Sequence, residues 1–94
     1  MIDITHFKTT PKEITIEIVA NVKARRKEQR LTQEQLSLKA GVSLGSLKRF
    51  ERTGEISLTS LLRIAIALDC QEDFLQLFSK KQYRSIQEII DEQD

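Results

Sequence analysis

The residues best suited to bind another molecule are cations near the middle of the chain. Residues 43–54, SLGSLKRFERTG, hold Lys48, Arg49 and Arg52 within three helical turns. An arginine guanidinium pairs in a bidentate way with phosphate or with the O6 and N7 acceptors of guanine. A lysine ammonium binds phosphate as a point charge. Residues of these types at this spacing therefore suit contact with a nucleic acid.

The charge is unevenly distributed along the chain. The 94 residues carry a formal net charge of +1, but residues 8–52 carry +6 and residues 53–94 carry −4. A basic half attracts a phosphate backbone, because each neutralised phosphate releases condensed counterions. Taken alone, the charge is equally compatible with helix faces that are simply solvated.

Catalytic and metal chemistry have little support. Cys70 is the only cysteine and His6 the only histidine, so one chain can form neither a disulfide nor a thiolate metal cluster. Cys70 is expected to be a small buried hydrophobe at the end of a helix. No nucleophile, base and orienting group can be assembled, and no glycine-rich phosphate loop is present. We therefore expect no enzyme activity, no metal site and no cofactor.

The hydropathy pattern predicts a protein of the cytoplasm. No run of residues approaches the ~20 apolar positions of a membrane span. The first residues, MIDITHFKTTP, lack the charged and then apolar order of a signal peptide. We therefore expect no membrane partner.

The elements that must position these cations begin with a helix from residue 11 to about Gln29. Thr10, Pro11 and Glu13 form a start signal that satisfies free amides at a helix N-terminus. Its apolar residues recur every four positions and are expected to form one stripe facing a core: Ile14, Ile18 and Val22.

Three further helix starts follow, each with an apolar residue before the cap that can pack onto the fourth helical residue. The pairs are Leu31 with Leu36 around Thr32, Val42 with Leu47 around Ser43, and Ile56 with Leu61 around Ser57. Ala40, Val42, Leu47 and Phe50 are expected in the core. The helix from Ser57 is the most apolar, and we expect it to be the central element: Leu61, Leu62, Ile64, Ala65 and Leu68.

The remaining residues predict two short helices. Residues 71–78 should form the fifth helix, with Phe74, Leu75 and Phe78 on one face, and residues 79–84 a loop. Ser85 starts a last helix whose apolar face carries Ile86, Ile89 and Ile90, and which must find a partner surface. Strand patterns are absent. The predicted fold is all-α: a compact bundle of five short helices plus a short C-terminal helix.

The boundaries follow from these elements. Residues 1–10 are expected to be an N-terminal arm, residues 11–78 one domain, and residues 79–94 a segment that contacts its own domain, a second subunit or another partner. Helices over residues 33–39 and from Ser43 are joined by a turn of three or four residues at Gly41, which suits a left-handed conformation. This spacing is typical of a helix-turn-helix, whose second helix enters the major groove of DNA. An ordinary corner between two helices has the same spacing.

The residues within this unit resemble a known family. Residues 31–51, LTQEQLSLKAGVSLGSLKRFE, and residues 57–70, SLTSLLRIAIALDC, are similar to the lambda repressor and Cro family of bacterial and phage regulators, also called the XRE family. The resemblance covers about residues 18–78. It implies a lambda repressor-like helix-turn-helix fold that binds double-stranded DNA.

The resemblance also implies roles at matching positions. Gln33 would hold a phosphate at the start of its helix, and Ser43 would cap the next helix and touch a phosphate. Arg49 is the best candidate for a base contact, and Lys48 would meet a phosphate. Arg26 and Glu51 would form an ion pair, in preference to a catalytic carboxylate. The full predicted DNA-binding set is Gln33, Ser43, Leu44, Gly45, Ser46, Lys48, Arg49, Arg52, Thr53 and Gly54.

Two positions depart from the family. Many relatives have polar base readers where this chain has Leu44 and Gly45. Leu44 can touch only a thymine methyl, and Gly45 has no side chain and weakens a helix by about 1 kcal/mol relative to Ala. Specificity would then come from Arg49, Ser46 and DNA shape, or the domain would bind chiefly through the backbone and need a dimer for useful affinity.

Three functions follow as hypotheses. The first is a transcriptional regulator, a homodimeric repressor on a two-fold symmetric operator with one recognition helix in each half-site. The second is an antitoxin that binds a kinase-like toxin and represses its own operon, because the whole chain resembles compact HipB-type antitoxins. The third is a helical adaptor that does not bind DNA. Nothing in the sequence indicates a ligand-sensing domain.

Overall fold

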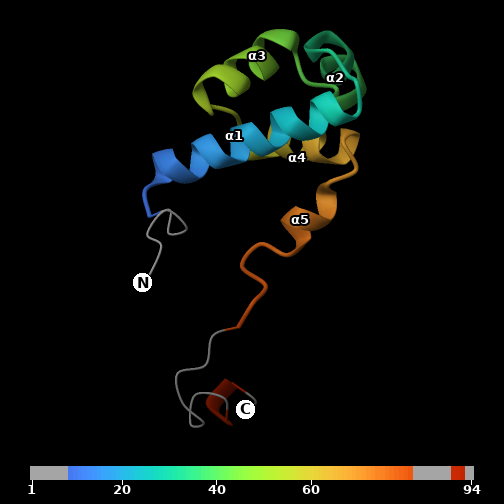
Figure 1. Cartoon of the computed structure of the whole chain (residues 1–94). Helices are drawn as coiled ribbons and strands as arrows, with labels where there is room; N and C mark the ends of the chain where they lie inside the picture. The colour runs from blue at the N-terminus through green and yellow to red at the C-terminus, as the bar shows by residue number, and fades with distance from the viewer. Residues whose placement is uncertain (1–8, 82–89, 93–94) are drawn as a thin grey trace.

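The computed structural model describes residues 9–81 and 90–92 of the chain. Within them it contains α1 (Pro11–Glu28), α2 (Gln33–Ala40), α3 (Leu44–Thr53), α4 (Leu58–Ala67) and α5 (Gln71–Leu75), residues 90–92 are also helical, and no strand occurs. Figure 1 shows α2 and α3 together along one side of the long α1, with α4 behind it and α5 leading away from the bundle. The prediction of an all-helical fold is confirmed.

The helices begin where the local start signals predict. The Thr10 hydroxyl accepts a hydrogen bond from the Glu13 amide at 3.1 Å. At α2 the capping box is complete, because Thr32 Oγ1 accepts from the Gln35 amide at 3.0 Å and Gln35 Oε1 accepts from the Thr32 amide at 2.9 Å. The same kind of cap, Ser57, begins α4. Each cap satisfies a backbone donor that the helix itself leaves unpaired, so these boundaries depend on nearby residues alone.

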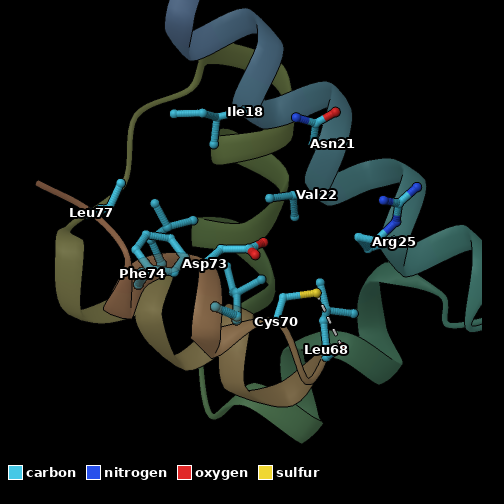
Figure 2. Close-up of a pocket in the computed structure, with 12 residues that line it drawn as sticks. Ile18, Asn21, Val22, Arg25, Leu68, Cys70, Asp73, Phe74 and Leu77 are labelled. Atoms are coloured by element: carbon cyan, nitrogen blue, oxygen red, sulfur yellow. Dashed lines mark hydrogen bonds between the residues drawn. The ribbon is translucent and has the colours of Figure 1, made fainter. Parts of the chain in front are cut away.

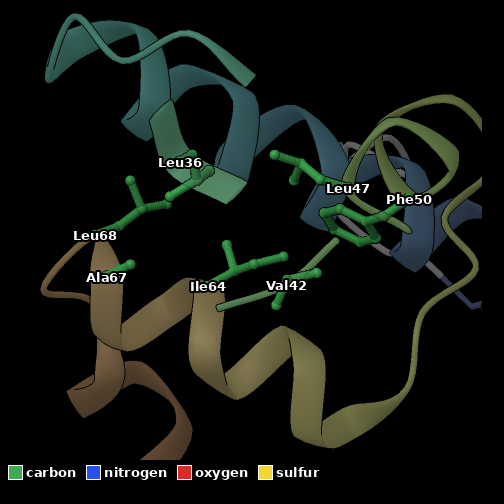
Figure 3. Packing of buried hydrophobic residues seen from close by; sticks show 7 residues of the cluster. All are labelled: Leu36, Val42, Leu47, Phe50, Ile64, Ala67 and Leu68. Carbon is green, nitrogen blue, oxygen red and sulfur yellow. The ribbon is translucent and has the colours of Figure 1, made fainter. Parts of the chain in front are cut away.

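The core lies where α2, α3 and α4 meet (Figure 3). Its buried side chains come from α2, from the turn after it, from α3 and from the end of α4: Leu36, Val42, Leu47, Phe50, Ile64, Ala67 and Leu68. Leu31, Ala40, Ile56 and Leu61 pack against this cluster. The three predicted apolar pairs around the caps therefore all contribute to the core. Because α4 and its C-cap residue supply three of the seven buried residues, α4 is a central element, as its composition predicts.

The expected apolar stripe of α1 is wrong at two of its three positions. Ile14 is 44% exposed and Ile18 is 38% exposed, whereas Val22 packs against the core. The buried side of α1 runs instead through Val19, Val22 and Arg26. A step of four residues turns 400°, so a stripe that begins at Ile14 drifts by 40° per step away from the line that faces α3. Ile14 and Ile18 lie at the edge of the bundle.

The fifth helix is shorter than predicted. It ends at Leu75 instead of Phe78, and Phe78 has a left-handed φ of 57° that cannot continue a helix. Leu75 and Phe78 are exposed and only Phe74 is half-buried, so the expected common face of these three residues is wrong. Cys70, the residue before α5, makes no side-chain cap. Of the expected C-terminal helix, Ile86 and Ile89 lie outside the described residues, and Ile90 is exposed.

Candidate nucleic-acid interface

The two helices of the predicted unit are joined by three residues. Gly41 ends α2 with a left-handed φ of 68°, and its amide donates to the Ser37 carbonyl. Val42 turns into the core, and Ser43 caps α3 by accepting from the Ser46 amide at 3.1 Å. Val42 is thus anchored in the core between Gly41, which ends α2, and Ser43, which begins α3. This arrangement fixes the angle between the two helices.

One side of α3 is buried and the other is open to solvent. The buried side carries Leu47, Phe50 and Glu51. The exposed residues of α3 and its cap are Ser43, Gly45, Ser46, Lys48, Arg49, Arg52 and Thr53. Positions 45, 48, 49 and 52 recur at intervals of three and four, so they form one continuous outer face with three cations. Leu44 is half-buried at the helix start.

The inner side of α3 is fixed to α1 by an ion pair. Arg26 Nε donates to Glu51 Oε2 at 2.9 Å, and Arg26 Nη2 donates to Glu51 Oε1 at 3.0 Å. Only 11% of the Arg26 side chain and 4% of the Glu51 side chain are exposed. Arg26 Nη1 also donates to the Leu31 carbonyl at 2.9 Å, which links the pair to the segment before α2. A bidentate pair of planar groups fixes orientation as well as distance.

Gln33 takes part in the same network. Its Nε2 donates to Glu51 Oε1 at 3.0 Å, so the side chain of the first α2 residue points to α3. The sequence suggested a phosphate ligand at this position and gave no indication of the contact with Glu51. In the structure the amide connects the start of α2 to α3, and the backbone N–H groups of the first turn of α2 remain the part of this site suited to an anion.

The outer face of α3 contains a second ion pair, which the sequence did not indicate. The Arg49 guanidinium donates to the carboxylate of Glu55, two residues beyond the end of α3. Thr53 lies between them, since its hydroxyl donates to the Arg49 carbonyl at 2.7 Å and accepts from the Glu55 amide at 3.1 Å. The predicted base reader is therefore already paired with an anion.

The loop after α3 lies directly against α1. Gly54 has a left-handed φ of 82°, and its amide donates to the Phe50 carbonyl at 2.7 Å. A Cβ on Gly54 would lie 2.1 Å from Thr15 Cγ2, so a side chain there would force Thr15 to move. By contrast, a Cβ on Gly45 would meet nothing within 4 Å. Gly54 therefore lets the loop after α3 lie close to α1, whereas Gly45 leaves an open position on the outer face of α3.

A separate apolar groove of about 370 Å³ lies between α1, α4 and α5. Figure 2 shows Ile18 and Val22 of α1 across from Phe74 and from Leu77, which follows α5. Cys70 also lines the groove. It packs against the core, as expected for a small hydrophobe, but it is only half-buried. In the described part of the chain, His, Cys, Asp and Glu side chains do not gather in threes that could hold a metal ion.

Two helices joined by a three-residue turn, with cations on the outer face of the second, define the helix-turn-helix class of DNA-binding domains. The family model described as helix-turn-helix matches residues 22–75, from the middle of α1 to the end of α5. The chain belongs to this family, in its XRE type. Domains of this type are DNA-binding transcription regulators and not catalytic domains.

The other comparisons add no relatives. No curated protein and no solved structure matches the chain. Among residues 9–81 and 90–92, no helix combines the length and the apolar character that crossing a membrane requires.

Proposed function

We propose that this protein is a sequence-specific repressor that binds a two-fold symmetric operator as a homodimer, with one α3 in the major groove of each half-site. The observation that carries the proposal is the outer face of α3, where Lys48, Arg49 and Arg52 are exposed together while the opposite side is anchored in the core. A rigid helix that presents cations on one face suits insertion into the groove.

Each exposed residue has a proposed role. Arg49 contacts guanine O6 and N7, and Lys48 contacts a phosphate. Leu44 and Ser46 lie near base edges, where Leu44 offers an apolar contact to a thymine methyl. The backbone contacts come from the two ends of the unit: Gln33 and Ser43 at the helix starts, and Arg52, Thr53 and Gly54 after α3.

Gly45 and Leu44 limit how much sequence α3 can read directly. Of the polar side chains on the outer face, Lys48 and Arg52 are assigned to phosphates, so Arg49 and Ser46 remain for base edges and a single domain reads few positions. A second α3, one helical turn away along the DNA, doubles the number of positions and adds the affinity that a single reading helix lacks. The small number of base pairs that one domain can read is therefore the argument for a dimer.

The segment after the domain is the proposed site of protein contact. Residues 11–78 form the DNA-binding domain, Leu75, Leu77 and Phe78 at its end are exposed, and Leu77 also lines the apolar groove. Exposed apolar side chains of this size gather where proteins associate. Residues 79–94 would therefore contribute to the contact with a second copy of the chain. If a toxin of the kinase class were the partner instead, the same surface would serve it.

Selection of binding sites from a randomised duplex library tests the proposal. The wild type should enrich a two-fold symmetric sequence. Arg49→Ala should weaken binding to that sequence by about 1–3 kcal/mol and relax one base pair in each half-site. Arg63→Ala, which removes an exposed arginine of α4, should leave affinity and preference unchanged. If the library yields no preferred sequence, the protein is not a sequence-specific regulator, and if Arg49→Ala keeps the preference, Arg49 is not the base reader.

A further inference from the structure

The ion pair between Arg49 and Glu55 places a carboxylate on the surface that is proposed to face DNA. Both side chains are 63% exposed, so burial does not explain why the two groups are held together. An exposed pair of this kind adds little to folding stability. A fixed negative charge beside a phosphate backbone also weakens binding to any DNA. Glu55 therefore lowers the affinity of this surface for DNA and adds only a little to the stability of the fold.

The backbone fixes the position of Glu55. Its amide is bound by the Thr53 hydroxyl, which is itself bound to the Arg49 carbonyl. The residue before it, Gly54, is pressed against Thr15 of α1 and bound to the Phe50 carbonyl. The carboxylate is thus attached to a rigid turn, at one defined place beside α3, and not to a free loop.

The pair leaves most of the Arg49 guanidinium available. The hydrogen bond to Glu55 uses one N–H of Nη2, and the second N–H of Nη2 forms, with one of the other two nitrogens, the edge of the guanidinium that stays open for a bidentate contact. A guanine edge is uncharged and accepts two of these donors without opposing the carboxylate. A phosphate that approaches the same donors brings a negative charge close to Glu55. The carboxylate therefore discriminates against phosphate much more than against a base.

We propose that Glu55 is a specificity-determining residue, which pairs with Arg49 so that this arginine binds a base edge in preference to the phosphates of non-specific DNA. The pair cancels the charge that would otherwise attract Arg49 to any backbone, and it holds the guanidinium on the outer face of α3. The proposal rests on the proposed function, because it requires α3 to face DNA. Discrimination by a repulsive group against the wrong contact is a general route to specificity.

Glu55→Gln tests this proposal, with Glu28→Gln as the matched control. Glu28 also forms an exposed pair with an arginine, Arg25, so its replacement makes the same change of net charge on α1. Affinity should be measured by fluorescence anisotropy for the duplex that the wild type selects and for a random duplex of the same length. Glu55→Gln should bind the random duplex about tenfold more tightly than the wild type, with a change of less than about threefold for the selected duplex.

The dependence on Arg49 separates the proposal from a general charge effect. In an Arg49→Ala background, Glu55→Gln should lose its specific gain and behave as Glu28→Gln does. An equal gain for both duplexes, or the same gain without Arg49, would overturn the role of Glu55. The random-duplex measurements need no selected site. If the wild type selects no sequence, the proposed function fails, while an Arg49-dependent gain on random DNA still supports the pair and its absence still refutes it. Thermal melting checks that all variants are folded.

Discussion

Glu51 accepts two hydrogen bonds from the Arg26 guanidinium, at 2.9 Å and 3.0 Å, and a third from Gln33 at 3.0 Å. The carboxylate therefore connects α1, α2 and α3 at one point. All three contacts lie on the inner side of α3, opposite the cations. Besides the apolar core, a single buried anion and its partners thus fix the orientation of the outer face.

Removing one member of this pair should destabilise the domain strongly. Arg26→Ala leaves the Glu51 carboxylate buried without its cation, so the free energy of unfolding should fall by about 3–5 kcal/mol. Arg25→Ala is the matched control, since the neighbouring arginine pairs with Glu28 on the surface, and its loss should cost less than about 1 kcal/mol. Urea denaturation followed by circular dichroism measures both. Equal losses for the two variants would contradict the buried character of the Arg26 pair.

The two glycines of α3 and its cap should respond in opposite directions to alanine. Gly45→Ala places a methyl group in open space on a helix, and should raise the free energy of unfolding by about 0.5–1 kcal/mol. Gly54→Ala forces a left-handed residue with a Cβ against Thr15, and should lower it by more than about 1–2 kcal/mol. Melting temperatures of the two variants provide the comparison. A stable Gly54→Ala protein would mean that α1 and the loop are not in close contact.

Lys48→Ala should change the salt dependence of DNA binding. If Lys48 neutralises one phosphate, its removal should reduce the slope of log affinity against log salt concentration by about one. Arg63→Ala, which removes an exposed cation of α4 outside the helix-turn-helix, is the control and should keep the slope of the wild type. Titrations at several salt concentrations decide the matter, and an unchanged slope for Lys48→Ala would remove this lysine from the DNA contact.

Deleting residues 82–94 should affect assembly or stability. The domain ends with exposed Leu77 and Phe78, and the deleted segment contains the apolar residues proposed to contribute to protein contact. We expect a lower melting temperature or a smaller dimer fraction in sedimentation, and with the latter a loss of operator affinity. A truncated protein with the stability, assembly and affinity of the full chain would assign that apolar face to a different partner, such as a toxin.

Features set by neighbouring residues could be predicted from the sequence. Thr10, Thr32, Ser43 and Ser57 cap helices through bonds to amides three residues away, so type and spacing alone locate the starts of four helices. The left-handed turn at Gly41 follows from the same local logic. Only family resemblance predicts the pairing of Arg26 with Glu51, because 25 residues separate the two and no local pattern joins them.

Features set by tertiary packing were missed. The exposure of Ile14 depends on which line along α1 faces the other helices, and a four-residue repeat drifts away from that line. No glycine signals the early end of α5 at Leu75 or the left-handed φ of Phe78. The Gln33 contact to Glu51 and the Arg49 contact to Glu55 require knowledge of side-chain direction.

The open space at Gly45 has a consequence for how such a regulator could acquire new target genes. The position lies on the outer face of α3, and a side chain added there would meet no other part of the protein. Substitutions at this position are therefore free of the folding penalty that limits most changes in small domains. Glutamine, asparagine or arginine at residue 45 would add a hydrogen-bonding group to the face of α3 that is proposed to contact DNA, and would stabilise the helix relative to glycine. If α3 reads DNA as proposed, a single substitution at residue 45 could therefore change the operator that the protein recognises.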